Sequence, residues 1–469
     1  MVRKKAPGFG NTMAAYILLM VTSFSATKIY AQTITQKLQK AFLIFEADEQ
    51  LSHAISSLYV IDAKSGKVVY DKNSGAGLAP ASTQKVITSA TAFALLGKDF
   101  NYTTSFAADN HSDKLYIFPS GDPTLGSERW VNTKPDKILS GIIRALEQHK
   151  NKINTIAIDN SRWALDYIPD GWIWQDIGNY YGAGSEKLNW RENQYDLLLQ
   201  SGENAGDPVR IVGANPKLYG YSLRSVATSA ARGTGDNAYI YFPLNDTTGI
   251  VKGTIPVNEN AFAISGAFPS GAGQFFAELA DRMIKTGIAA SIPEIKPVAS
   301  IPAEDYTTIY TETSPPLDSI IYWLNKKSIN LYGEALLKTI SYKERGYSAT
   351  DTGIAVVQDF WKQNGIDVAE LNIVDGSGLS PLNRVTTHAM VQILQYAQKQ
   401  NWFPSFLKSL PEYNGMKMKS GTIRNVKGFT GYHTSSDGKT YIFSFLVNNY
   451  NGSASALVRK MYAVLNVLK

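Results

Sequence analysis

Cysteine is absent from this chain of 469 residues, and histidine is scarce. Without cysteine there is no disulfide framework, no thiol nucleophile and no thiolate metal site. No two histidines stand four residues apart as in a helical zinc site, and neither a Walker loop nor a Gly-x-Ser-x-Gly elbow occurs. We therefore expect no cofactor and no metal, and a hydrolase would need a base other than histidine. The five histidines are His53, His111, His149, His388 and His433.

Charge of one sign is not in excess once the N-terminus is set aside. The chain has 46 basic and 40 acidic residues, and residues 1–31 hold four of the basic residues and no acidic one. Such a balance gives no electrostatic footprint for nucleic acid. The same N-terminal residues combine a basic start, an apolar stretch over 13–24, and small residues at Ala26 and Ala31. This pattern predicts a signal peptide over 1–31 and a location in the periplasm or cell envelope.

Hydrophobic runs long enough to cross a bilayer are also missing. The apolar stretch of the leader is shorter than the roughly 20 residues that a spanning helix needs, and every later segment of that length contains charge or glycine. An uncleaved leader that acts as an anchor, and peripheral association with the membrane, stay open as alternatives to release.

The pattern of strand-like and helical segments changes twice along the chain. Short strand-like runs broken by Gly, Asn, Asp and Pro fill residues 99–311. We expect an inserted, mostly β region of one or two subdomains there, with one helix over 273–284. The flanking parts predict helices over 35–50, 83–96, 317–342, 349–364 and 453–468, and strands over 55–62, 67–71, 425–432 and 440–448.

Ser82 and Lys85 stand three residues apart at the start of a buried apolar helix. At this spacing the two side chains share one face of the helix, so the Ser82 hydroxyl can pass its proton to the Lys85 amine. An apolar setting and the positive end of the helix both disfavour the ammonium form, which makes Lys85 a usable base. The structural alternative is that Ser82 is a helix N-cap. The same spacing recurs at Ser25/Lys28, Ser405/Lys408 and Ser436/Lys439, so the pattern needs support from other residues.

Two further motifs follow in chain order. Ser328 and Asn330 place a hydroxyl and an amide two residues apart, where both can point into a cleft. Lys419-Ser420-Gly421-Thr422 precedes a strand-like run, in which Gly421 would let a substrate lie against the strand and Lys419 could hold an anionic group. Two similar tripeptides are interpreted as structural, Lys285-Thr286-Gly287 at the end of a helix and Lys64-Ser65-Gly66 at a hairpin turn.

In this order, Ser-x-x-Lys, Ser-x-Asn and Lys-Ser-Gly resemble the three motifs of the serine penicillin-recognising enzymes. The surrounding chain is similar to the class C low-molecular-mass penicillin-binding proteins, the D-alanyl-D-alanine carboxypeptidase/endopeptidase group, over nearly its whole mature length. The matching stretches are 79–85, 121–125, 181–183, 188–189, 192–193, 314–317, 325–332, 375–380 and 419–422.

The resemblance implies a role for each motif residue. Ser82 would be the acylated nucleophile, Lys85 its base, Ser328 the proton relay toward the leaving group, and Asn330 the residue that holds the substrate backbone or Lys85. Lys419 would bind the terminal D-Ala carboxylate, with Ser420 and Gly421 beside it. The backbone N–H groups of Ser82 and Thr422 would form the oxyanion hole. For Asp159, which lies in the insert, two roles stay open. Its carboxylate would either reach the site and pair with an amine of the substrate, or have a purely structural role.

The resemblance also implies the architecture. An α/β (α+β) catalytic domain of the penicillin-binding type, with helices covering a mostly antiparallel sheet, would be split into 32–97 and 312–469. The insert at 98–311 would form two nested subdomains, the inner one over roughly 195–255. Two departures from the family pattern stand out. Ser420 replaces the commoner Thr, and Pro381 stands where the family often has an Arg for a carboxylate of the stem peptide.

The sequence thus predicts a serine-type D-Ala-D-Ala carboxypeptidase or endopeptidase. Its partners would be peptidoglycan stem peptides as substrate and β-lactam antibiotics as covalent inhibitors. One alternative is a β-lactamase or esterase on related machinery, for which no deacylating Glu is recognisable. Another is a non-catalytic cell-wall-binding protein, which would have no need of Ser82, Lys85, Ser328 and Lys419 together.

Overall fold

The computed structural model describes residues 1–4, 32–149, 152–243, 246–299, 301 and 305–469. The signal peptide predicted over 1–31 therefore lies almost wholly outside the described residues. Within the described ranges, no helix is both long enough and apolar enough to cross a bilayer.

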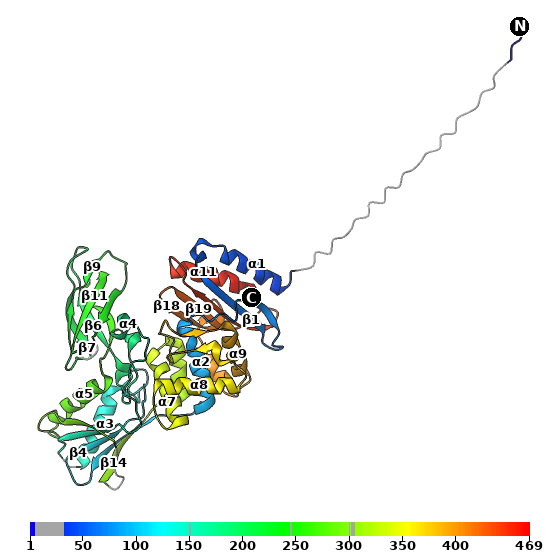
Figure 1. The fold of residues 1–469 in the computed structure, drawn as a ribbon. Coiled ribbons are helices and arrows are strands. Elements are labelled where there is room, and N and C mark those ends of the chain that lie inside the picture. Colours follow the sequence, from blue (N-terminus) through cyan, green and yellow to red (C-terminus); the bar gives the residue numbers. More distant parts are fainter. Residues whose placement is uncertain (5–31, 150–151, 244–245, 300, 302–304) are drawn as a thin grey trace.

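A six-stranded antiparallel sheet forms the centre of the larger body, on the right of Figure 1. Its strand order is β17-β18-β19-β20-β1-β2, so the first and last parts of the chain share one sheet. β1 pairs with β20 over its full length. The mostly antiparallel sheet implied by the resemblance is confirmed. The strands are β1 (Ile55–Asp62), β2 (Val68–Lys72), β17 (Glu412–Tyr413), β18 (Met416–Ile423), β19 (Val426–Thr434) and β20 (Thr440–Asn448).

Helices cover both faces of this sheet, which is why β1 is buried on both sides. Leu58 and Val60 face the core under α1 and α11, whereas Tyr59 and Ile61 face the core around α2. Side chains alternate between the faces of a strand, so a run that is apolar throughout marks a central strand. The helices are α1 (Ile34–Glu46), α2 (Lys85–Leu96), α6 (Leu317–Lys327), α7 (Asn330–Arg345), α8 (Thr350–Gln363), α9 (Thr387–Gln398), α10 (Phe403–Ser409) and α11 (Ala454–Leu465).

One predicted helix is broken in two. The sequence predicted a continuous helix over 317–342, but α6 ends and α7 begins on either side of Ser328. Ser328 has φ 58° and ψ 40°, a left-handed conformation that ends α6 and turns the chain. Few non-glycine residues adopt it without support from their surroundings, and such residues concentrate at functional sites.

The residues between α2 and α6 form a second body on the left of Figure 1. A five-stranded mixed sheet has the order β13-β5-β4-β3-β14 and packs against α3 (Pro135–His149) and α5 (Gly271–Lys285). Both edge strands, β13 and β14, come from the C-terminal end of the insert, and β14 pairs with β3 from its N-terminal end. The strands are β3 (Thr103–Asp109), β4 (Lys114–Phe118), β5 (Thr155–Asp159), β13 (Glu294–Val298) and β14 (Tyr306–Thr313).

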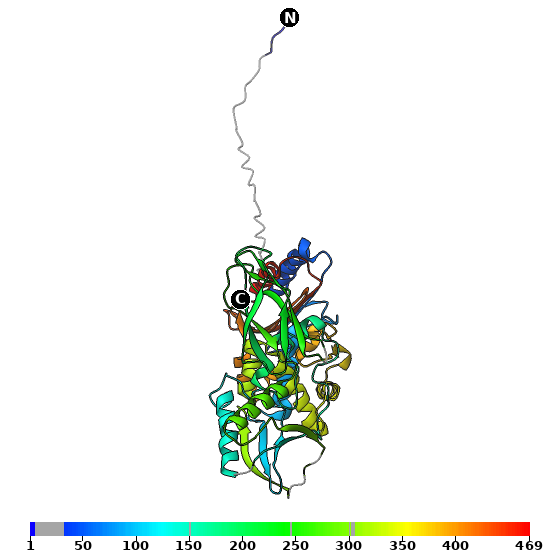
Figure 2. The ribbon, with the colours of Figure 1, turned by 90° about the vertical axis from the view of Figure 1, so that its left-hand side faces the viewer.

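Two small sheets lie inside this insert and form what we call the β6–β12 lobe, residues 194–267. Their orders are β12-β6-β7 and β10-β11-β8, with β9 also paired to β11. Figure 2 shows the molecule from the side on which this lobe lies. On this basis we propose that 98–311 is an insert of two nested units, although the inner strands extend past the 195–255 expected. The strands are β6 (Gln194–Gln200), β7 (Arg210–Asn215), β8 (Ser222–Ser225), β9 (Thr228–Ala230), β10 (Asn237–Tyr241), β11 (Thr248–Pro256) and β12 (Phe262–Ala267).

Candidate active site

Ser82 lies in a 3-10 turn, Ala81–Gln84, that leads directly into α2. The predicted helix therefore begins two residues later than expected, at Lys85. Ser82 is partly exposed, whereas the Lys85 side chain beneath it is fully buried. The Lys85 Nζ lies 3.0 Å from the Ser82 Oγ. A nucleophile open to the cleft is thus backed by an amine that water does not reach.

Lys85 is held by two further oxygens from distant parts of the chain. Its Nζ donates to the Asn330 Oδ1 at 2.6 Å and to the backbone carbonyl of Ser377 at 2.7 Å. Burial lowers the pKa of Lys85 to about 7, and the nearby carboxyl groups of Asp375 and Glu334 oppose that shift. An amine with a pKa near neutrality can accept a proton from a hydroxyl at physiological pH.

The break between α6 and α7 brings Ser328 and Asn330 to the same place as Ser82. Asn330 begins α7, and its Nδ2 donates to the Tyr181 carbonyl of the insert at 2.6 Å. The Ser328 Oγ accepts from the Lys419 Nζ at 2.9 Å. The second and third motifs are therefore in contact with each other, and the second is in contact with the first.

The third motif lies within β18 itself, not before a strand as predicted. Lys419 is almost fully buried, and burial, with the nearby Lys85, lowers its pKa well below the usual value. A Cβ on Gly421 would lie within 3.0 Å of the Pro80 carbonyl and of the backbone nitrogens of Ser82 and Thr83. The glycine thus lets β18 lie against the nucleophile turn, which aligns the two backbones.

A turn after β15 (Leu371–Asn372) closes the site behind Lys85. Asp375 is fully buried, and its carboxylate accepts from the backbone N–H groups of Gly378 and Ser380 at 2.7 Å each. Trp172 of the insert donates its indole N–H to the same carboxylate at 3.0 Å. These bonds hold the Ser377 carbonyl on Lys85. The turn ends at β16 (Arg384–Val385).

Glu334 is a second buried carboxyl behind the site, one turn along α7 from Asn330. Its Oε2 accepts from the Gly376 N–H at 2.9 Å, whereas its Oε1 is buried without a hydrogen-bond partner. Burial, and then the nearby Asp375, raise the pKa of Glu334 to about 8. Lys338, one turn further on, is also buried near it.

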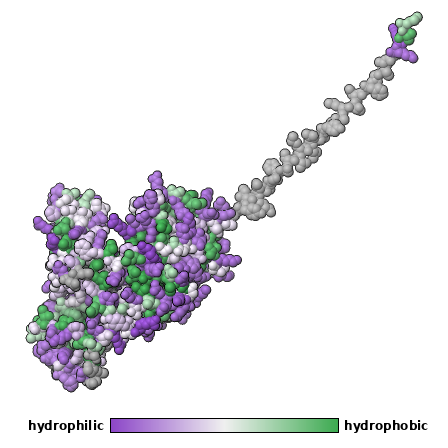
Figure 3. Space-filling view, viewed as in Figure 1, coloured by the Kyte–Doolittle hydropathy of each residue, from purple (hydrophilic) through white to green (hydrophobic). Residues whose placement is uncertain are grey.

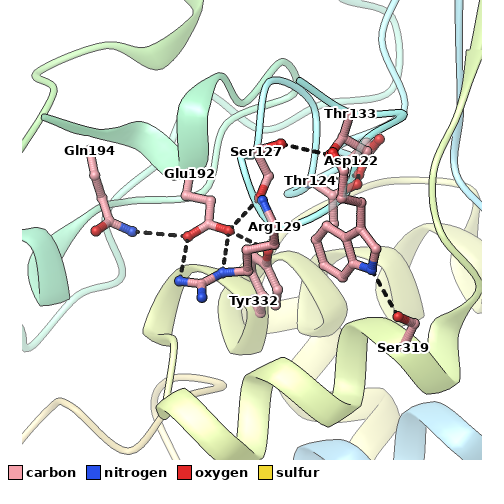
Figure 4. Close-up of polar contacts among 10 residues, drawn as sticks. Asp122, Thr124, Ser127, Arg129, Thr133, Glu192, Gln194, Ser319 and Tyr332 are labelled. Atoms are coloured by element: carbon pink, nitrogen blue, oxygen red, sulfur yellow. Dashed lines mark hydrogen bonds and ion pairs between the residues drawn. The ribbon is translucent and has the colours of Figure 1, made fainter. Parts of the chain in front are cut away.

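The insert contacts the start of α7 through Glu192, which Figure 4 shows at the centre of a polar network. Its carboxylate accepts two bonds from Arg129, at 2.7 and 3.0 Å, and one each from the hydroxyls of Ser127 and Tyr332 at 2.7 Å. Tyr332 follows Asn330 by two residues. Glu192 has φ 55°, so this contact holds a strained backbone in place.

Asp159 is not brought to this site. It ends β5, accepts from the Ser161 N–H, and lines a cavity of about 660 Å³ with Thr339 and Tyr342 near the far end of α7. Asn330 and Tyr342 are twelve residues apart on one helix, about 18 Å at 1.5 Å per residue. The structure thus places Asp159 away from Asn330, near the opposite end of α7, and of the two alternatives it is the structural one that agrees with this position.

Two contributors to the site act through backbone carbonyls. Ser377 and Tyr181 accept from Lys85 and Asn330, and a carbonyl carries no side-chain signature. Only the wider match of the stretches 181–183 and 375–380 to the family pointed to these segments. In the parts of the chain that the structure describes, no three metal-ligating side chains come together.

Comparison with known proteins gives the class. The sequence profile of the D-Ala-D-Ala carboxypeptidase 3 (S13) family matches residues 38–412. The chain belongs to this family, and its activity is that of a serine D-Ala-D-Ala carboxypeptidase. This confirms the resemblance from which the sequence prediction was drawn.

Two relatives and one solved structure illustrate the match. The chain is 26% identical over 459 residues to a D-alanyl-D-alanine carboxypeptidase from Actinomadura sp. strain R39, covering 89% of this chain and 82% of that protein. It is 23% identical to the D-alanyl-D-alanine carboxypeptidase DacB of Haemophilus influenzae, covering 82% and 83%. The crystal structure of penicillin binding protein 4 (dacB) from Haemophilus influenzae superposes with a TM-score of 0.77 at 19% identity, covering 94% and 100%. This likeness confirms the predicted fold class.

Proposed function

We propose that this protein hydrolyses the terminal D-Ala–D-Ala bond of peptidoglycan stem peptides through an acyl-enzyme on Ser82, in the periplasm or cell envelope. The observation that carries the proposal is the 3.0 Å contact between the Ser82 Oγ and a fully buried Lys85 amine, in a chain of the D-Ala-D-Ala carboxypeptidase family. The charge pattern of the leader supports the location.

Acylation begins with the free amine of Lys85, which takes the proton of the Ser82 hydroxyl as the Oγ attacks the carbonyl carbon of the penultimate D-Ala. The backbone N–H groups of Ser82 and Thr422 stabilise the oxyanion, a charge that develops only in the transition state. Ser328 relays the proton that Lys85 has taken up to the leaving amine nitrogen, the C–N bond breaks, D-Ala departs, and Lys85 is again a free amine. Asn330 keeps Lys85 in position. Water then cleaves the ester and restores Ser82.

Lys419 recognises the terminal carboxylate in this proposal. Its pKa is lowered by burial in the free protein, and an arriving carboxylate favours the charged ammonium. Ser420 and Gly421 line the strand beside it. When the leaving amine belongs to a cross-link, the same steps make the enzyme an endopeptidase.

Penicillins would acylate Ser82 by the same attack on the β-lactam amide. In support, the penicillin binding protein 4 (dacB) from Haemophilus influenzae has been crystallised in complex with a novel β-lactam. The test is the intact mass of the purified protein after exposure to a penicillin, beside its rate of D-Ala release from a stem pentapeptide. A persistent adduct with D-Ala release supports the proposal. Destruction of the penicillin without an adduct favours a β-lactamase. If the protein forms no adduct, leaves the penicillin intact and releases no D-Ala, a binding protein is favoured.

Acylation is expected to depend on pH through Lys85. Because the pKa of Lys85 is lowered to about 7, the reactive free amine predominates above that pH and is lost below it. The acylation rate with penicillin should fall about tenfold per unit as the pH drops below 7. Stopped-flow measurement from pH 5.5 to 9 checks this, and a flat profile contradicts it.

Lys419→Ala should discriminate between substrates. We expect kcat/KM for a peptide with a free terminal carboxylate to fall at least about 100-fold, the cost of a lost charge-assisted hydrogen bond. A depsipeptide or amide without that carboxylate should lose much less. Steady-state kinetics with the matched pair of substrates measures the difference. An equal loss of kcat/KM on both substrates would mean that Lys419 holds β18 in place and does not bind the terminal carboxylate.

A further inference from the structure

The segment 172–182 of the insert bridges the active site and the β6–β12 lobe. At one end the Tyr181 carbonyl accepts from the Asn330 Nδ2 at 2.6 Å. At the other, α4 (Trp174–Ile177) contacts β10, and the Trp174 Nε1 donates to the Phe242 carbonyl at 3.2 Å. Figure 1 shows α4 between the lobe and the larger body, and Figure 3 shows a notch that separates the two. A surface on this segment therefore continues directly from the catalytic groups.

Aromatic side chains gather on this segment and on the lobe strand beside it. Trp174 and Tyr241 meet with ring centroids 5.0 Å apart, and Tyr180 and Tyr181 meet at 5.3 Å. Burial raises the pKa of Tyr181, and the nearby Asp176, Tyr239 and Tyr241 add to that shift, so both lobe tyrosines lie close to Tyr181. We call these five residues, Trp174, Tyr180, Tyr181, Tyr239 and Tyr241, the aromatic platform.

The aromatic platform is not part of a hydrophobic core. Trp174 and Tyr180 each keep 51% of their surface exposed, and none of the five side chains is fully buried. Large aromatic rings left open to water beside an active site need another explanation than packing. Lys252 adds a polar group at the edge, because its Nζ lies over the rings of Trp174 at 5.7 Å and Tyr241 at 5.0 Å.

The chemistry of this surface selects one ligand class. The apolar C–H faces of pyranose rings stack on aromatic rings, while a single amine at the edge can donate to hydroxyl or acetamido oxygens. A polyanion would require several cations, and among the residues that the structure describes Lys252 is the one cation recorded over these rings. In peptidoglycan a stem peptide is attached at its other end to a chain of N-acetylated amino sugars, so a cell-wall substrate that reacts at Ser82 brings such a chain with it.

We propose that the aromatic platform binds the glycan of the cell-wall substrate, as a saccharide subsite separate from the catalytic groups. This inference rests on the proposed function, since it takes the substrate to be peptidoglycan. The platform would raise the local concentration of glycan-linked peptides at Ser82, and it explains why an exposed aromatic surface belongs to an insert that carries none of the three motifs.

Kinetics on a matched pair of substrates tests the proposal. One is a free stem pentapeptide, and the other is the same peptide attached to a neutral-sugar tetrasaccharide of N-acetylated units. In Trp174→Ala, and separately in Tyr180→Ala, the ratio of kcat/KM for the glycan-linked over the free peptide should fall about fivefold to tenfold, the effect of one stacked ring. Tyr347→Ala is the control, an aromatic residue that is 43% exposed beyond the other end of α7.

A ratio that stays unchanged in both platform variants, or falls equally in Tyr347→Ala, overturns the proposal. Calorimetry with tetra-N-acetylchitotetraose as a probe adds a readout that needs no catalysis: the wild-type protein should bind it and Trp174→Ala should bind it at least fivefold more weakly. Absence of binding to the wild-type protein also overturns the proposal. If the wild-type protein releases no D-Ala from the free peptide, the proposed function fails instead, and the calorimetric result still decides the subsite.

Discussion

Replacing Ser82 with alanine is expected to lower kcat/KM for a D-Ala-D-Ala peptide by at least about 10³-fold and to abolish the penicillin adduct. The reason is that the Oγ forms the bond on which both reactions depend, and nothing else at the site can replace it. Intact mass spectrometry reads the adduct, and D-Ala release reads the peptidase. The variant should fold, because Ser82 is partly exposed and its Oγ contact is with Lys85 alone among the residues described here.

Ser405→Ala is the matched control for this prediction. Ser405 begins a second Ser-x-x-Lys sequence, on α10, but its partner Lys408 is exposed and no hydrogen bond joins the two. That variant should keep full activity and the full adduct. An adduct that persists in Ser82→Ala, or is lost in Ser405→Ala, would mean that the nucleophile has been assigned to the wrong serine.

Glu192→Ala is expected to have the largest effect on the folded structure. It removes the carboxylate that accepts from Arg129, Ser127 and Tyr332, and leaves the Arg129 guanidinium in a half-buried position without its anion. Breaking such a pair costs about 3–5 kcal/mol when fully buried, and about 3 kcal/mol here because Arg129 keeps some access to water. The start of α7 should also loosen, which lowers the acylation rate through Asn330.

Thermal unfolding and stopped-flow acylation measure the two consequences together. Glu128→Ala is the control, since Glu128 lies close by but forms only an exposed ion pair with Lys134 at 3.7 Å, which is worth little. Glu192→Gln should retain part of the stability because its amide oxygen still accepts hydrogen bonds. If Glu192→Ala unfolds at the wild-type temperature and acylates at the wild-type rate, the network does not hold α7.

Much of the catalytic body could be predicted from the sequence. The strands expected over 55–62 and 440–448 are β1 and β20, and the helix expected over 349–364 is α8 within one residue at each end. These elements are buried and strongly periodic, so their patterns are clear. The two tripeptides interpreted as structural are so: Gly66 and Gly287 both have positive φ, the first in a hairpin turn and the second after α5.

Other elements were missed for identifiable reasons. The region around α3 was predicted to be strand-like, although Ile138, Ile142 and Leu146 recur at helical spacing and are buried. α9 and α10 were not predicted, although Ala389, Ile393 and Ala397 of α9 recur at helical spacing and are buried. The break at Ser328 has no local signal, since neither Gly nor Pro marks it. It exists because Lys419 and the packing of α6 and α7 hold Ser328 in that conformation.

The amino-acid sequence alone specifies which chemical groups this protein has and in what order they occur: a serine with a lysine three residues on, a serine and an amide, and a lysine followed by a serine and a glycine. Those facts are covalent, so folding cannot alter them. Folding brings Lys85 to Asn330 across 245 residues, buries its amine so that the pKa falls to about 7, and places Asp159 elsewhere. Burial and contact depend on how distant segments pack, and a local pattern carries no record of that.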